Sequence, residues 1–173
     1  MIYMVEQTFS MPKLEADWNV WYMANLDVLM AVPGFKSGQR FQVIGAKPSE
    51  YLAMYTIASA DVFDSAIYKN SGGGGTASQR FRPAYQVWKR NLLDLETAPE
   101  VAMDQCLLVL DAPQPAAVGN IAFTWMQTVG LHKTTPWRGI AVVAANALPD
   151  LNNKSGMRVL HPMTLQHHGT YNS

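Results

Sequence analysis

The 173-residue chain contains one cysteine, no surplus of either charge and no long apolar run. Cys106 alone cannot form an internal disulfide, so the cysteine count gives no indication of secretion. Thirteen basic residues balance thirteen acidic ones, and without a field of one sign we expect neither a nucleic acid nor a membrane partner. No apolar run approaches the ~18 residues that span a bilayer, and Glu6 comes too early for a signal peptide. A cytoplasmic protein is therefore expected.

Several catalytic and ligand-binding signatures are also missing. The sequence has no serine nucleophile elbow, Cys–His pair, zinc signature or dinucleotide fingerprint. The glycine run at residues 72–75 lacks the Lys-Ser or Lys-Thr of a phosphate loop, so it predicts a mobile connector or a pocket lid instead. His167 and His168 have no Cys or carboxylate at ligand spacing nearby. We therefore expect neither a metal nor a bound cofactor.

The first 60 residues carry clear structural patterns. Ile2–Phe9 alternates as a strand with both faces covered does. Residues 14–29 place apolar and aromatic side chains at spacings of three and four, which predicts a helix with an aromatic stripe. Pro33 and Gly34 end that helix, and strands are expected at 38–44 and 51–57.

The remainder completes an α+β pattern. Helices are expected at 60–69 and from Arg82 to Leu95, followed by a strand at 105–111. The order βαββαβ over residues 1–111 is that of a ferredoxin-like fold. Residues 112–165, with a helical pattern at 116–130 and strands at 140–145 and 157–161, are either a degenerate second repeat or a simple extension. The polar residues 166–173 are expected to form a flexible tail.

One segment resembles a known family. A Trp-Tyr pair opens the helix, a Pro-Gly-Phe turn follows it, an Arg lies on the second strand and an aromatic residue lies near the end of the third. This resembles EthD-like members of the dimeric α+β barrel superfamily over roughly residues 1–60. The residues are Asp17, Trp18, Asn19, Val20, Trp21, Tyr22, Pro33, Gly34, Phe35, Arg40 and Tyr55. The resemblance implies an α+β barrel in which the sheet packs on a second copy, giving a homodimer, or on the chain's own second half.

The resemblance also implies a function. It suggests a cofactor-independent lyase, isomerase, cyclase or monooxygenase acting on a small aromatic or hydrophobic carbonyl compound in an apolar pocket between helix and sheet. In that interpretation Arg40 and Asn25 polarise the substrate oxygen, and His161 or Tyr55 moves the proton. The pocket walls are expected to be Trp18, Trp21, Tyr22, Tyr55 and Met54.

Two other functions remain open. Relatives often carry a histidine where this chain has Asn25, and an amide cannot act as a general base near neutral pH, which favours a non-catalytic small-molecule-binding or stress-related barrel. A haem-binding barrel is the third hypothesis, with His132 or His161 as the axial ligand. The structural alternatives are a histidine at a helix end for His132, one at a strand end for His161, and an acid-paired strand residue for Arg40.

Overall fold

The first strand, β1 (Ile2–Phe9), is the centre of the sheet that carries the helices. The structure is a computed structural model that describes residues 1–73, 76–150 and 156–171. β1 pairs antiparallel with β3 (Ser49–Ile57) on one side and β4 (Tyr85–Leu93) on the other, and β3 pairs with β2 (Phe35–Val43). The first half-sheet therefore has the order β4-β1-β3-β2.

The second half-sheet closes the first into a barrel. It consists of β5 (Gln105–Ala112), β6 (Thr124–Leu131), β7 (Trp137–Ala144) and β8 (Met157–Pro162), in the order β8-β5-β7-β6. If the strands of each half are numbered 1 to 4 along the chain, both half-sheets have the order 4-1-3-2. β4 pairs with β6 and β2 pairs with β8, which closes eight antiparallel strands within one chain. A short ninth strand, β9 (His167–His168), also pairs with β2.

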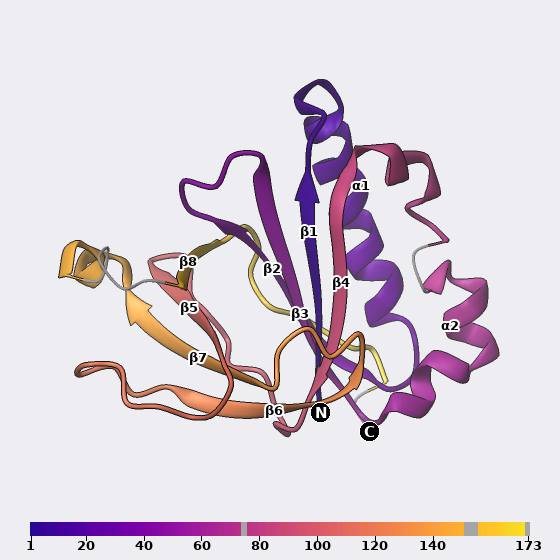
Figure 1. Ribbon diagram of the computed structural model, residues 1–173. Helices are drawn as coiled ribbons and strands as arrows, with labels where there is room; N and C mark the ends of the chain where they lie inside the picture. The colour runs from indigo at the N-terminus through magenta and orange to yellow at the C-terminus, as the bar shows by residue number, and fades with distance from the viewer. Residues whose placement is uncertain (74–75, 151–155, 172–173) are drawn as a thin grey trace.

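The two α-helices of the described residues lie on the side of the first half-sheet (Figure 1). α1 (Pro12–Met30) begins with a proline at its first turn and buries Trp18, Tyr22, Leu26, Leu29 and Met30 against the sheet. The 3-10 helix η1 (Ala60–Asp64), the short helix α2 (Ala66–Asn70) and the 3-10 helix η3 (Gln79–Ala84) lie between β3 and β4. The 3-10 helix η4 (Ala145–Asp150) follows β7. No helix of the described residues is long and apolar enough to cross a membrane.

Alternation along the strands gives the sheet two buried faces. On β1, Tyr3, Val5 and Phe9 face α1, whereas Ile2 and Met4 face the barrel interior. The segment between β4 and β5 fills one end of the barrel, because Ala98 and Val101 belong to the interior core. Gln39 holds this segment by bonding both the backbone N–H and the C=O of Val101.

Residues 82–95 form a strand where the sequence pattern predicted a helix. The aromatic residues Tyr85 and Trp88 suggested a helical stripe, but successive residues of β4 face opposite sides of the sheet. Both edges of β4 are paired, so its backbone groups are satisfied by β1 and β6. β5, predicted as the strand that completes the first sheet, instead pairs with β7 and β8.

Two more predictions are wrong. Residues 116–130 contain no helix, because β6 occupies the region from Thr124 onwards and its β-branched and aromatic residues suit a strand. The predicted flexible tail is tied down over its described part, since β9 pairs with β2 and Thr170 N–H bonds Met30 C=O. The helix at 60–69 is confirmed as η1 and α2. Of the glycine run, only Gly72 and Gly73 lie within the described residues.

Candidate active site between helix and sheet

A small pocket lies between α1 and the outer face of the first half-sheet. Its floor comes from Tyr3, Val5 and Gln7 of β1 and Tyr55 of β3, and α1 supplies Trp21, Tyr22 and Asn25. Trp88 of β4 and the small residues Gly72, Gly73 and Ala77 complete it. The cavity measures about 50 Å³. None of the described residues that line it is charged.

Gly73 sits directly against the ring of Tyr68, which also lines the pocket. A β-carbon at Gly73 would overlap that ring, so only glycine lets the chain pass this close. A second close approach lies behind the pocket, where a β-carbon at Gly38 would come within 2.8 Å of the ring of Tyr55. Glycine at these two places lets both tyrosine rings lie flat against the backbone.

Tyrosine hydroxyls are the main polar groups of the pocket. Those of Tyr22 and Tyr55 are hydrogen-bonded to each other. Burial raises the pKa of Tyr22 to about 12, although the nearby Arg40 guanidinium opposes that rise. Burial likewise raises the pKa of Tyr55 and of Tyr3 well above the ordinary value. All three stay protonated at neutral pH and can donate hydrogen bonds, but they cannot act as bases.

Arg40 lies behind the pocket in a cage of aromatic rings. Its side chain is 1% exposed, and its guanidinium carbon lies 4.4 Å from the ring of Trp18, 4.3 Å from Tyr22 and 4.8 Å from Tyr51. Nη2 donates to Asn19 Oδ1 at 2.6 Å. Nε and Nη1 have no hydrogen-bond partner in the described part of the chain, and no described carboxylate forms an ion pair with Arg40. The prediction of an acid-paired strand arginine is therefore wrong.

The charge of Arg40 is thus compensated mainly by ring faces. Burial lowers the pKa of its guanidinium, which shows that this environment disfavours the cation relative to water. The cluster continues through Trp18, whose Nε1 donates to the Tyr85 hydroxyl at 2.8 Å, and through Tyr51, whose hydroxyl donates to Glu15 at 2.6 Å. A buried cation that has no acid partner among the described residues, next to an uncharged pocket, creates a positive potential there.

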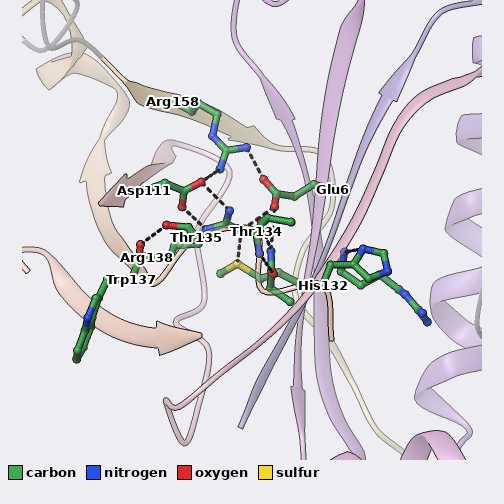
Figure 2. Close-up of polar contacts among 11 residues, drawn as sticks. Glu6, Asp111, His132, Thr134, Thr135, Trp137, Arg138 and Arg158 are labelled. Carbon is green, nitrogen blue, oxygen red and sulfur yellow. Dashed lines mark hydrogen bonds and ion pairs between the residues drawn. The ribbon is translucent and has the colours of Figure 1, made fainter. Parts of the chain in front are cut away.

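A second buried arginine lies in the barrel interior, and unlike Arg40 it is surrounded by carboxylates (Figure 2). Arg138, also 1% exposed, bonds Asp111 through Nε at 2.7 Å and Nη2 at 2.9 Å, and its Nη1 lies 2.9 Å from Glu6. Arg158 pairs with the same two acids. These contacts raise the pKa of Arg138 in spite of its burial. Each charge in this network has an opposite neighbour, and we read it as a structural link between the two half-barrels.

Several predicted site residues meet as expected. Trp21, Tyr22, Asn25 and Tyr55 line the pocket, and Trp18 and Arg40 lie behind it. Asn25 was expected to act on the substrate oxygen together with Arg40. It lines the pocket, whereas Arg40 bonds Asn19, six residues earlier on α1.

Three other predicted residues do not reach the pocket. Met54 faces the barrel interior, because it has the opposite strand parity to Tyr55. His161 is exposed on β8, opposite Gln42 of β2, and does not line the pocket. His132 does not end a helix: it follows β6, where its Nδ1 accepts a hydrogen bond from Arg90 N–H at 3.2 Å. Among the described residues no cluster of His, Cys, Asp and Glu suits a metal ion.

Sequence reasoning missed Tyr3, Gln7, Tyr68 and Trp88 as lining residues. Tyr3 and Gln7 carried a usable signal, since they share the parity of Val5 on a strand that was predicted correctly. Trp88 was predicted to lie on a helix, and a helical pattern does not indicate which face of strand β4 its side chain takes. Tyr68 depends on how α2 folds back over the sheet, which no local pattern specifies.

Comparison with known proteins gives a fold but no family. No family model matches the sequence, and no curated protein matches it. A crystal structure of an anthrone oxidase-like protein aligns with TM-score 0.65 and 8% identity, covering 98% of this chain and 93% of that one. A candidate monooxygenase from Lactobacillus acidophilus aligns with TM-score 0.60 and 10% identity over 95% and 94% of the two chains. One from Fusobacterium nucleatum gives 0.61 and 9% over 97% and 94%. The chain therefore has the α+β barrel fold of proteins named as monooxygenases.

Proposed function

We propose that the protein is an enzyme that oxidises a small phenolic or enolic aromatic compound with dioxygen, in the pocket between α1 and the sheet, without a bound cofactor. The observation that carries this proposal is Arg40, a fully buried cation that has no acid partner in the described part of the chain and lies behind a pocket of aromatic rings and tyrosine hydroxyls. The names of the structural neighbours support the reaction class. We also propose that the chain is related to EthD-like proteins.

The residues suit an anionic form of the substrate. Arg40 supplies positive potential through the ring of Tyr22. The Tyr55 hydroxyl donates to that of Tyr22, which leaves the Tyr22 O–H to donate a hydrogen bond to a developing oxyanion. No described lining residue is a carboxylate, imidazole or amine, so the pocket offers no ordinary base. The substrate must therefore be acidic enough to ionise in this field, as phenols and enols conjugated to a carbonyl are.

An electron-rich anion of this kind can itself reduce dioxygen. In the oxidation of a ring CH2 group to a ketone, dioxygen adds at that carbon, one oxygen atom stays as the new carbonyl and the other leaves as water. The two hydrogens of the water come from the CH2 group, and the substrate supplies all four electrons. The role of Asn25 is to orient the substrate oxygen, which an amide can do without exchanging a proton.

The cavity must widen before such a substrate can bind. About 50 Å³ holds one or two water molecules, whereas cavities that accept one benzene ring measure ~150 Å³. Gly72, Gly73 and Ala77 form the side of the pocket with the smallest side chains. We propose that the pocket widens at this side, where the described lining residues have the least side-chain volume.

The test uses anthrone as the probe and isotopically labelled dioxygen as the oxidant. We expect oxygen uptake above that of heat-denatured protein and a quinone product that carries one labelled oxygen atom. Replacing Tyr22 by Phe removes one oxyanion donor and should lower turnover by about 100-fold. His161→Gln is the matched control: it changes an exposed residue away from the pocket and should leave turnover unchanged.

A non-catalytic binding barrel remains the second candidate, because the pocket lacks a base. A panel of phenols and enols separates the two functions. If the protein retained these probes without oxygen uptake, it would be a binding protein and not an oxidase. The haem hypothesis has little support, since neither His132 nor His161 lines the pocket. Turnover that falls in His161→Gln as much as in Tyr22→Phe would contradict the assignment of the pocket.

A further inference from the structure

The segment that forms the roof and one wall of the pocket is strongly basic. Residues 65–93 contain five cations and no aspartate or glutamate, in a chain whose total charges cancel. The cations are Lys69, Arg80, Arg82, Lys89 and Arg90. Lys69 pairs with Asp64 at 3.6 Å, but no described carboxylate forms an ion pair with the three arginines. The basic segment therefore keeps positive charge available beside the pocket.

Two of these arginines contact the ring of Trp88, a residue of the pocket lining. The guanidinium carbons of Arg82 and Arg90 each lie 4.6 Å from the ring of Trp88. The register of β4 places Trp88 opposite Gln7 and Arg90 opposite Val5, and both β1 residues line the pocket. Arg90 thus shares the pocket face of the sheet. Its charge also acts on the neighbouring Tyr3, where it opposes the rise in pKa caused by burial.

Arg90 has hydrogen-bonding capacity that the chain does not use. Its side chain is half-buried, and Nε is shielded from solvent without a hydrogen-bond partner among the described residues. Arg82 is exposed, so its guanidinium can turn towards a ligand while remaining stacked on Trp88. A buried donor without a partner costs stability, and a forked guanidinium binds a planar carboxylate through two parallel bonds.

We propose that the substrate is an aromatic acid whose carboxylate binds Arg82 and Arg90 at the rim, while its ring system enters the pocket beside Trp88. This inference rests on the proposed function and adds the substrate class. Arg40 and the tyrosines act on the reacting oxygen at the inner end. The rim pair sets the orientation of the molecule by holding its second anionic group outside.

Binding of two matched probes tests this directly. 2-Naphthoate carries the carboxylate and 2-naphthalenemethanol replaces it with a neutral group of similar size; quenching of the pocket tryptophans reports binding. We expect Arg90→Met to weaken 2-naphthoate binding by about 10- to 100-fold, since one charge-assisted contact is lost. Binding of 2-naphthalenemethanol should change by less than threefold. Added salt should weaken only the acid.

Lys69→Met serves as the control, because it removes one positive charge from the same basic segment but not from the rim. It should leave both affinities unchanged. Arg90→Lys keeps the charge without the fork and should give an intermediate affinity, which guards against a failure of Arg90→Met to fold. Equal loss of both probes in Arg90→Met would overturn the carboxylate site. If the wild type bound the alcohol but not the acid, the rim site would be wrong and the pocket right; if it bound neither, the proposed function would fail as well.

Discussion

The two fully buried arginines give the sharpest prediction, because the same substitution should have opposite effects on them. Arg40 and Arg138 are each 1% exposed, but Arg138 contacts two carboxylates and Arg40 contacts none among the described residues. We expect Arg40→Met to leave the free energy of unfolding unchanged or to raise it. Arg138→Met should destabilise the protein strongly.

The magnitudes follow from what each side chain gains in the fold. Burying the Arg40 guanidinium removes its hydration, which costs several kcal/mol. In the fold it gains three cation–π contacts of ~0.5–2 kcal/mol each and one hydrogen bond to the half-buried Asn19. Methionine avoids the desolvation cost and fills a similar volume. The net effect should lie between zero and about 2 kcal/mol of added stability. Arg138→Met leaves Glu6 and Asp111 short of a partner and should cost about 3–5 kcal/mol.

Urea unfolding at neutral pH, combined with the oxidation assay, measures both sides of this prediction. Arg40→Met should keep or raise the midpoint of unfolding while turnover of the probe falls by 100-fold or more. Such a trade of activity against stability is expected of a residue retained for function. A loss of stability in Arg40→Met comparable to that in Arg138→Met would show that Arg40 is structural and would refute the reasoning.

Three further predictions concern the remaining features. Burial alone raises the pKa of Glu6, but Arg138 and Arg158 outweigh it and lower the pKa below its ordinary 4.5. The stability contributed by Glu6 is therefore present above about pH 4.5 and is lost as the pH falls through the lower folded value, so Glu6→Gln should flatten the acid limb of a urea-unfolding series across pH. Asn25→Leu should weaken probe binding by about tenfold with little change in melting temperature, because the amide lines the pocket and has no bond to the described residues that would be broken. The homodimer expected from the resemblance should appear in sedimentation as twice the 19.2 kDa chain mass; a monomer would show that closure within one chain is sufficient.

Local patterns predicted the first half of the fold well. β1 and α1 have single, unambiguous periods, and their bounds match the predictions closely. β4 failed because Tyr85, Trp88 and Leu92 also fit a helical spacing, and only the pairing of β4 with β1 and β6 decides between the two. Which strands cover the interior face of the first half-sheet also depends on long-range pairing, which local patterns do not reveal. Because β6 and β8 close the barrel within the chain, the expected homodimer would have to form through another surface.

Residue identity at the site was more predictable than residue environment. Parity and helical spacing placed Tyr22, Tyr55 and Asn25 at one pocket. The sequence also singled out Arg40, but whether that arginine had an acid partner depends on which side chains meet across β2, β3 and α1. His161 was misplaced because the direction of β8 is set by its pairing with β2 and β5, which the residues around it do not reveal.

A balanced net charge also conceals an uneven distribution across one sheet. Glu6 faces the barrel interior, where it neutralises Arg138 and Arg158, and its neighbour Gln7 faces the pocket without a charge. Because successive strand residues point to opposite sides, the ion-paired charges lie on one face, whereas the arginines on the other face have no acid partner among the described residues. The zero total therefore argues against an extended polyanion, which needs positive charge over a large surface. It does not argue against a small anion, which needs only two or three guanidiniums such as those of Arg40, Arg82 and Arg90 next to the pocket lining.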